Sequence, residues 1–187
     1  MDWLEEVRQK VKRRNQILFS KDSDILRELS EMLSAQNRRV VVLWALEGAE
    51  KLKDLLAEKY PEDDRPTAAI AAARLWATGK IRMPLAKQDI LRCHAMAKDL
   101  SSQEDIALCH AIGQACSTIH TVRHALGLPI YELTFLVRHY GLENCRIPVE
   151  HRCREYLDRL QFWKETEPHI LMEWANFMQK ERTHPSC

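Results

Sequence analysis

The sequence predicts an all-α protein, and two observations carry that prediction. Turn-forming residues are scarce, with five Gly and seven Pro among 187 residues. Apolar residues recur at intervals of three and four rather than two, which is the period of a helix. No segment of the sequence alternates as a strand does. We therefore expect a single domain of about nine helices, whose helical hairpins pack as a bundle or a short solenoid.

The expected helix boundaries follow from helix breakers and caps. Tyr60 and Pro61 end the third helix, because the residue before a proline avoids helical dihedral angles. Ser101 and Glu104 form an S-x-x-E capping box that opens the sixth helix. In order, the expected helices span about 2–18, 25–33, 38–59, 66–79, 84–100, 101–126, 129–140, 148–164 and 168–180.

The composition excludes several classes of partner. The chain has 28 Lys and Arg against 27 Asp and Glu, so no long-range field favours nucleic acid or an anionic membrane.

The opening residues, MDWLEEVRQKVKRRNQ, are not followed by a signal-peptide core, and we expect the protein in the cytoplasm. The longest apolar run, VVVLWAL at 40–46, is shorter than the roughly 20 residues that span a bilayer. Six cysteines without a CxxC pair predict reduced thiols that fill the core.

The sixth helix carries an unusual second face. When the segment is projected at about 100° per residue, an apolar stripe lies on one side. The other side, within roughly 120°, collects small residues and imidazoles instead of the Lys and Glu of an ordinary solvent face. We expect a half-buried polar seam there, completed by a histidine of the fifth helix. The seam residues are His94, His110, Gln114, Ser117, His120 and His124.

Three interpretations of this seam compete. A metal ion could be held by His94, Cys116, His120 and His124, since the last three lie at successive intervals of four. No HExxH motif and no carboxylate on the seam support a catalytic metal. Nucleophilic catalysis by Cys116 with His120 lacks an orienting acid. We therefore favour rings that exchange hydrogen bonds where helices pack, with the small Gly113 and Ser117 admitting a neighbour.

An acidic ridge is expected on the third helix. Its four carboxylates fall within an arc of roughly 80° and could meet a basic surface on a partner. The ridge consists of Glu47, Glu50, Asp54 and Glu58.

Four blocks of sequence resemble the helical family of putative immunity proteins of bacterial polymorphic-toxin systems. The blocks are WA-x-x-x-A-E, RP-x-x-A-I-x-x-A-R-x-W-x-x-G-x-I, HA-x-A-[KR] and A-x-x-H-x-x-x-H-A-L-G. In this chain they fall on Trp44, Ala45, Ala49 and Glu50; on Arg65, Pro66, Ala69, Ile70, Ala73, Arg74, Trp76, Gly79 and Ile81; on His94, Ala95, Ala97 and Lys98; and on His120, His124, Ala125, Leu126 and Gly127.

The resemblance covers about residues 39–160 and implies a cytoplasmic all-helical protein that binds and blocks a cognate toxin without a catalytic group or a cofactor. It also suggests a family-like core over 39–164, preceded by a helical hairpin extension at 1–38 and followed by a C-terminal helix and tail at 165–187. Many relatives have Gly-His where this chain has Gly113 and Gln114, which favours a structural seam over a metal cage.

Two alternatives from other classes of protein stay open. One is a helical metal-binding protein or metal-dependent hydrolase that uses His94, His120 and His124. The other is a self-associating structural protein, which would form a stable homo-oligomer.

Overall fold

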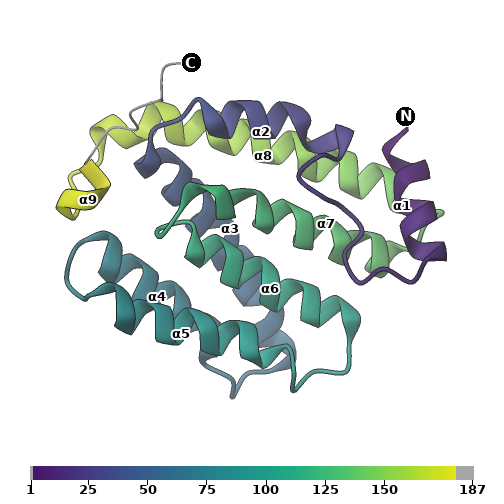
Figure 1. Ribbon diagram of the computed structural model, residues 1–187, viewed down its shortest axis with the longest axis horizontal. Helices are drawn as coiled ribbons and strands as arrows, with labels where there is room; N and C mark the ends of the chain where they lie inside the picture. Colours follow the sequence, from purple (N-terminus) through teal and green to yellow (C-terminus); the bar gives the residue numbers. More distant parts are fainter. Residues whose placement is uncertain (1, 180–187) are drawn as a thin grey trace.

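The computed structural model describes residues 2–179, and these residues form nine α-helices, three short 3-10 helices and no strand (Figure 1). The prediction of an all-α single domain is confirmed. The α-helices are α1 (Trp3–Lys12), α2 (Arg27–Ser34), α3 (Arg38–Lys59), α4 (Arg65–Ala77), α5 (Met83–Met96), α6 (Gln103–Ser117), α7 (Gly127–Tyr140), α8 (Arg146–Thr166) and α9 (Asn176–Gln179). The 3-10 helices are η1 (Asp24–Leu26), η2 (Val122–Leu126) and η3 (Glu167–His169).

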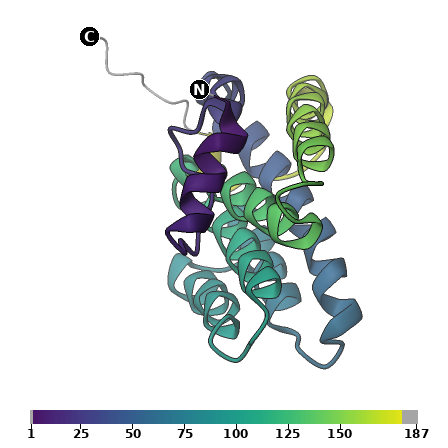
Figure 2. The same ribbon diagram turned by 90° about the vertical axis from the view of Figure 1, so that its right-hand side faces the viewer.

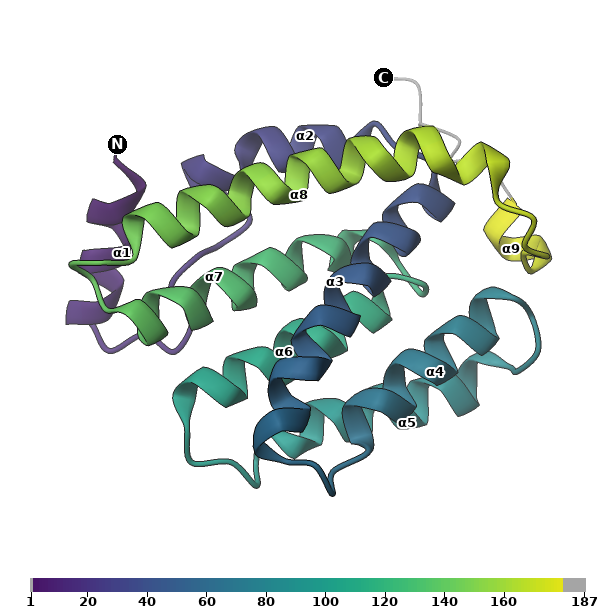
Figure 3. The same ribbon diagram turned by 180° about the vertical axis from the view of Figure 1, so that it is seen from behind.

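Consecutive helices pack as antiparallel pairs. The pairs α4–α5 and α6–α7 lie side by side, and α2 runs along α8 at the opposite edge of the molecule (Figure 1). Seen from behind, α3 crosses α6 and α7 diagonally and reaches from α8 to the α4–α5 pair (Figure 3). The end view places α6 and α7 between α1 and α3 (Figure 2). Within residues 2–179, none of the helices combines the length and apolarity that crossing a bilayer requires.

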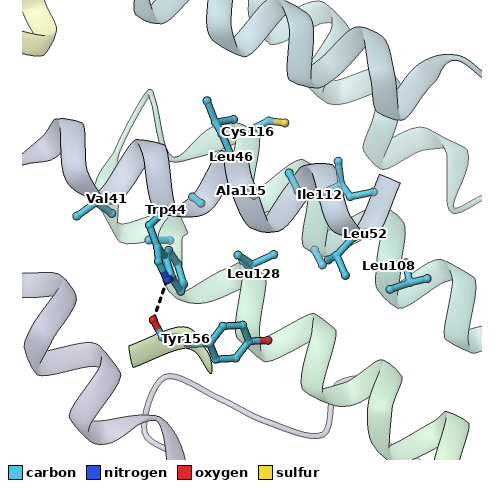
Figure 4. Close-up of a cluster of buried hydrophobic side chains, with 14 of the residues drawn as sticks. Val41, Trp44, Leu46, Leu52, Leu108, Ile112, Ala115, Cys116, Leu128 and Tyr156 are labelled. Atoms are coloured by element: carbon cyan, nitrogen blue, oxygen red, sulfur yellow. Dashed lines mark hydrogen bonds between the residues drawn. The ribbon is translucent and has the colours of Figure 1, made fainter. Parts of the chain in front are cut away.

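The central helix α3 is apolar on every side in its first half. All seven residues of the VVVLWAL run at 40–46 are buried, as expected for a helix surrounded by other helices. Asn37 caps the helix, because its side chain accepts a hydrogen bond from the N–H of Val40 at 3.0 Å. The core side chains of α3 face α6, α7 and α8, with Trp44 beside Tyr156 (Figure 4).

The first helix is shorter than the expected 2–18. It ends at Lys12, and Arg14 then takes a positive φ of 58°, which an L-residue adopts in turns rather than in helices. The chain continues without helical hydrogen bonds, and the N–H of Leu18 donates to the Thr134 hydroxyl of α7 at 3.1 Å. The early end therefore reflects contacts with α7. Because α1 contributes to the same core cluster as the other helices, it belongs to the single domain, and the limit at residue 38 stays a prediction.

The prediction of one continuous C-terminal helix over 168–180 is wrong. The structure shows η3, then an irregular segment, and α9 only from residue 176. The backbone N–H of Ala175 donates to the carbonyl oxygen of Ala77 in α4 at 2.9 Å, so a tertiary contact replaces the helical hydrogen bond at that position. The tail predicted for 180–187 lies outside the described residues.

The start of α6 differs from the predicted capping box of Ser101 and Glu104. The N-cap is Ser102, whose hydroxyl accepts from the N–H of Asp105 at 3.2 Å. Asp105 is buried and accepts a charged hydrogen bond from Lys59, at the end of α3, at 2.7 Å. This ion pair between α3 and α6 fixes where α6 begins. Lys59, which forms it with Asp105, lies 46 positions earlier in the sequence.

Candidate functional site

The polar seam does not lie on one continuous helix. The helix predicted over 101–126 ends at Ser117, and His124 lies in the 3-10 helix η2. His120 and His124 are therefore not one turn apart on a helical face, and that prediction is wrong. The Thr118 hydroxyl donates to the backbone oxygen of Gln114 at 3.2 Å, and such side-chain bonds to the backbone weaken a helix.

Arg38 also helps to end α6. Its guanidinium, projecting from the start of α3, donates to the carbonyl oxygen of His120 at 2.9 Å and to that of Ile119. A cation at the C-terminal end of a helix satisfies carbonyl groups that have no partner within the helix. The end of α6 is thus set by a residue about 80 positions earlier.

Three imidazoles from three different elements still lie near one another. We call His94 of α5, His110 of α6 and His124 of η2 the imidazole cluster. The Nδ1 atoms of His94 and His110 lie 3.1 Å apart, so one ring must donate and the other accept. The Nδ1 atom of His124 lies 2.8 Å from the amide oxygen of Gln114, which accepts its hydrogen bond. The Tyr131 ring of α7 packs on His110 with 5.2 Å between ring centroids.

Gly113 makes room for the cluster. A Cβ atom at this position would lie 2.4 Å from Nε2 of His94, well inside contact distance. The absence of a side chain lets α5 approach α6 closely enough for the two imidazoles to bond. This close approach agrees with the interpretation of the seam as a place where helices pack.

The imidazole cluster is neutral near pH 7. Burial, and then the neighbouring rings of His110 and His124, lower the pKa of His94 to about 4. Burial lowers the pKa of His110, and burial together with the nearby His120 lowers the pKa of His124. The mutual hydrogen bond requires at least one neutral ring as its acceptor, because two imidazolium ions would both be donors.

Acid is expected to destabilise the protein through this cluster. A folded-state pKa below the ordinary value of about 6.5 means that the unfolded chain binds protons first, so stability falls as the pH drops from about 6.5 towards 4. His94 alone contributes up to about 3 kcal/mol to this loss. Urea unfolding at a series of pH values measures it. His94→Gln, which stays neutral, should flatten the profile, and an equally steep profile in that variant would contradict the assignment.

The remaining seam residues lie elsewhere. His120 is exposed and stacks on Trp76 of α4, with ring centroids 6.1 Å apart. The Ser117 hydroxyl donates to the backbone oxygen of Gly113 at 2.8 Å. Cys116 is fully buried among core residues of α3 and α6 (Figure 4), and burial raises the pKa of its thiol well above the ordinary value. Across residues 2–179, no group of three or more His, Cys, Asp or Glu side chains is arranged to hold a metal ion.

The acidic ridge is divided by contacts within the protein. Glu47 faces α8, where its carboxylate accepts from the Arg159 guanidinium at 2.8 and 3.0 Å and from the indole N–H of Trp163 at 2.6 Å. Glu50 pairs with Arg74 of α4 at 3.1 Å. Two of the four carboxylates therefore hold neighbouring helices in place.

The outer half of the ridge remains accessible. The Asp54 side chain is 72% exposed and lies 3.2 Å from the Lys53 ammonium group. Glu58 is exposed and forms no ion pair with any residue in 2–179. This end of the ridge is more exposed than the end formed by Glu47 and Glu50.

The buried carboxylate of Glu132 was not predicted from the sequence. Glu132 of α7 is 3% exposed, accepts from the Tyr156 hydroxyl at 2.6 Å and pairs with the Arg152 guanidinium at 2.9 Å. We call Glu132, Arg152 and Tyr156 the carboxylate triad. Burial raises the pKa of Glu132, while the charge of Arg152 and the bond from Tyr156 oppose that shift. The only signal in the sequence is one acid inside the apolar stretch IYELTFLV.

The fold and the paired polar groups describe an all-helical protein, and comparison with family models gives its family. The model described as "Imm-5 like putative immunity protein" matches residues 31–159. The match covers more than half of the chain. The chain therefore belongs to this family, and the predicted resemblance is confirmed. The curated proteins and the solved structures yield no match.

Proposed function

We propose that the protein is a non-enzymatic inhibitor that binds a cognate bacterial toxin in the cytoplasm. Membership of the immunity-protein family over residues 31–159 carries the proposal. An inhibitor of this kind blocks its target by covering it, so it requires a stable scaffold and a complementary surface rather than a catalytic group.

The internal pairing of polar groups supports a scaffold role. Asp105 joins α3 to α6, Glu47 joins α3 to α8, and Glu132 joins α7 to α8. The three imidazoles of the cluster bond to each other or to Gln114. Groups of this type that perform chemistry are usually open to a substrate, whereas these are occupied by other parts of the protein.

The exposed end of the acidic ridge is our first candidate for the toxin-binding surface. Asp54 and Glu58 extend from α3 and would attract a basic patch on the toxin. The whole chain carries a net charge of only +1, which is unlike the strongly acidic surface of an inhibitor that imitates nucleic acid. We therefore propose a local charge contact rather than mimicry of DNA or RNA.

Capture of the toxin tests the function. The protein should retain the product of the toxin gene that neighbours its own gene, and its co-expression should restore growth of cells that produce this toxin. Retention of none of the neighbouring products, together with no effect on growth, would contradict the inhibitor proposal.

Charge reversal tests the ridge. Asp54→Lys combined with Glu58→Lys is expected to weaken toxin binding about tenfold, mainly by slowing association, and the effect should shrink at high salt. Binding kinetics at two salt concentrations measure this change. The matched control is Glu28→Lys with Glu143→Lys, which changes two exposed carboxylates on other elements. If the two double variants weaken binding equally, the ridge is not part of the interface. That result would not contradict the inhibitor function itself.

A further inference from the structure

An apolar groove of about 850 Å³ opens beside the imidazole cluster, between the segments 17–34 and 114–131. One wall comes from the connection between α1 and α2 together with α2, and the other comes from η2 and the start of α7. Its apolar lining includes Ile17, Val122, Leu126 and Ile130. Ile17 is 38% exposed and none of the other three is fully buried, so the groove presents apolar surface to solvent.

The wall formed by the α1–α2 connection is fixed in place. The Arg138 guanidinium of α7 donates to the backbone oxygen of Gln16 at 2.7 Å, next to the bond between Leu18 and Thr134. Phe19 is 2% exposed and packs on Trp3 with 5.9 Å between ring centroids. A wall held by such contacts loses little conformational entropy when a partner binds.

We call the part of the groove that Gln114 and Tyr131 line its floor. Gln114 and Tyr131 line the groove, and they contact His124 and His110 respectively. Burial lowers the pKa of His94 to about 4 and also lowers the pKa of His110 and His124, which favours neutral rings near pH 7. The floor therefore suits apolar side chains.

The charged residues that line the groove have one sign. They are Lys21 and Arg123, both exposed, and neither forms an ion pair with any residue in 2–179. No Asp or Glu lines the groove. Since Lys21 and Arg123 flank the apolar groove, a complementary partner combines apolar side chains with carboxylates.

We propose that this groove binds an acidic amphipathic helix of the toxin partner. The inference rests on the proposed inhibitor function and adds a second contact surface to the ridge. The apolar face of the helix packs against Ile17, Leu126 and Ile130, while its carboxylates pair with Lys21 and Arg123. Strand addition is unsuited to this surface, because residues 2–179 contain no strand edge.

Two labelled peptides test the groove without the toxin. Both are about 18 residues long, so that they form helices on binding, and both carry leucines at helical spacing. One has Glu at every polar position and the other has Lys. Fluorescence anisotropy should show that the acidic peptide binds about tenfold more tightly than the basic one. Lys21→Glu with Arg123→Glu should reverse that order, and Ile17→Asp should weaken binding of both peptides.

A matched variant controls for net charge. Lys80→Glu with Arg82→Glu makes the same charge change at two exposed positions outside the groove, and it should leave the preference for the acidic peptide unchanged. Circular dichroism melts confirm that each variant is folded. Absence of peptide binding, equal affinity for the two peptides, or equal effects of the two double variants would overturn the groove proposal.

A second copy of the chain would be a different occupant. Sedimentation that shows a dimer, converted to a monomer by Ile17→Asp, would overturn the proposal in favour of self-association through this groove. Failure of the groove is distinguishable from failure of the function, because the peptides contain no toxin. Toxin capture without peptide binding contradicts the groove and leaves the inhibitor function intact. Peptide binding without toxin capture contradicts the inhibitor function and leaves the groove as a site for acidic helices that do not come from a toxin.

Discussion

Trp44→Ala is expected to lower the free energy of unfolding by about 3–5 kcal/mol, the range for removing a large aromatic side chain from a core. Trp44 is 3% exposed and lies in the first half of α3. Its indole N–H donates to the backbone oxygen of Tyr156 at 3.0 Å, and the two rings meet edge to face at 5.8 Å (Figure 4). The substitution removes the main contact between α3 and the middle of α8. Urea unfolding followed by circular dichroism measures the loss.

Two further variants separate volume from hydrogen bonding. Trp44→Phe keeps most of the apolar contact and loses the indole donor, so it should cost about 1–3 kcal/mol. Phe162→Ala removes an aromatic ring that is 42% exposed on α8, and should cost less than about 1 kcal/mol. A loss for Trp44→Ala no larger than that for Phe162→Ala would contradict a central role for this indole.

Arg152→Ala is expected to cost about 3 kcal/mol near pH 7, the lower end of the range for breaking a buried ion pair. The variant leaves the Glu132 carboxylate buried without its cation. We place the expectation at the lower end because the Arg152 side chain is 25% exposed, which lets water reach part of the site. Chemical unfolding of both proteins in the same buffer measures the difference.

The cost of Arg152→Ala should depend on pH. Because burial raises the folded-state pKa of Glu132, the stability linked to this group is complete below its unfolded pKa and is lost as the pH rises through the folded pKa. Removing Arg152 takes away a charge that opposes this rise, so the loss near pH 7 grows. The difference between variant and wild type should therefore shrink in acid. The Glu132→Gln exchange should rescue much of the loss in the double variant, and a difference that does not change with pH would contradict this account.

The fold class and the central helix were predictable because they depend on local pattern. A run of seven apolar residues at 40–46 with a polar cap before it indicates a helix surrounded by others, wherever its partners lie. Packing of the helices as hairpins was also expected. These features need only the period of apolar residues and the positions of Pro and Gly.

The candidate site was only partly predictable, because its geometry depends on distant residues. Some seam residues do form pairs, because His94 contacts His110 and His124 contacts Gln114. Helical projection placed His120 and His124 on one face, but Arg38 and the Thr118 hydroxyl end the helix first.

The contacts of the acidic ridge also depend on distant residues, so they could not be predicted from the sequence. Glu47 falls on the expected arc, yet its partner Arg159 lies 112 positions later in the chain. A pattern of spacing within one helix cannot reveal which residue will approach from elsewhere.

The contact between Trp44 and Tyr156 also has a consequence for synthesis on the ribosome. The α4–α5 and α6–α7 pairs join neighbours in sequence and can form soon after each emerges. The α3–α8 contact instead joins positions 112 residues apart. Until α8 leaves the exit tunnel, one side of the apolar first half of α3 has no cover, and unfinished chains expose an apolar surface that favours aggregation. Stalled nascent chains whose α8 is still inside the tunnel should therefore recruit chaperones, whereas chains in which an added C-terminal linker has carried residue 166 out of the tunnel should not.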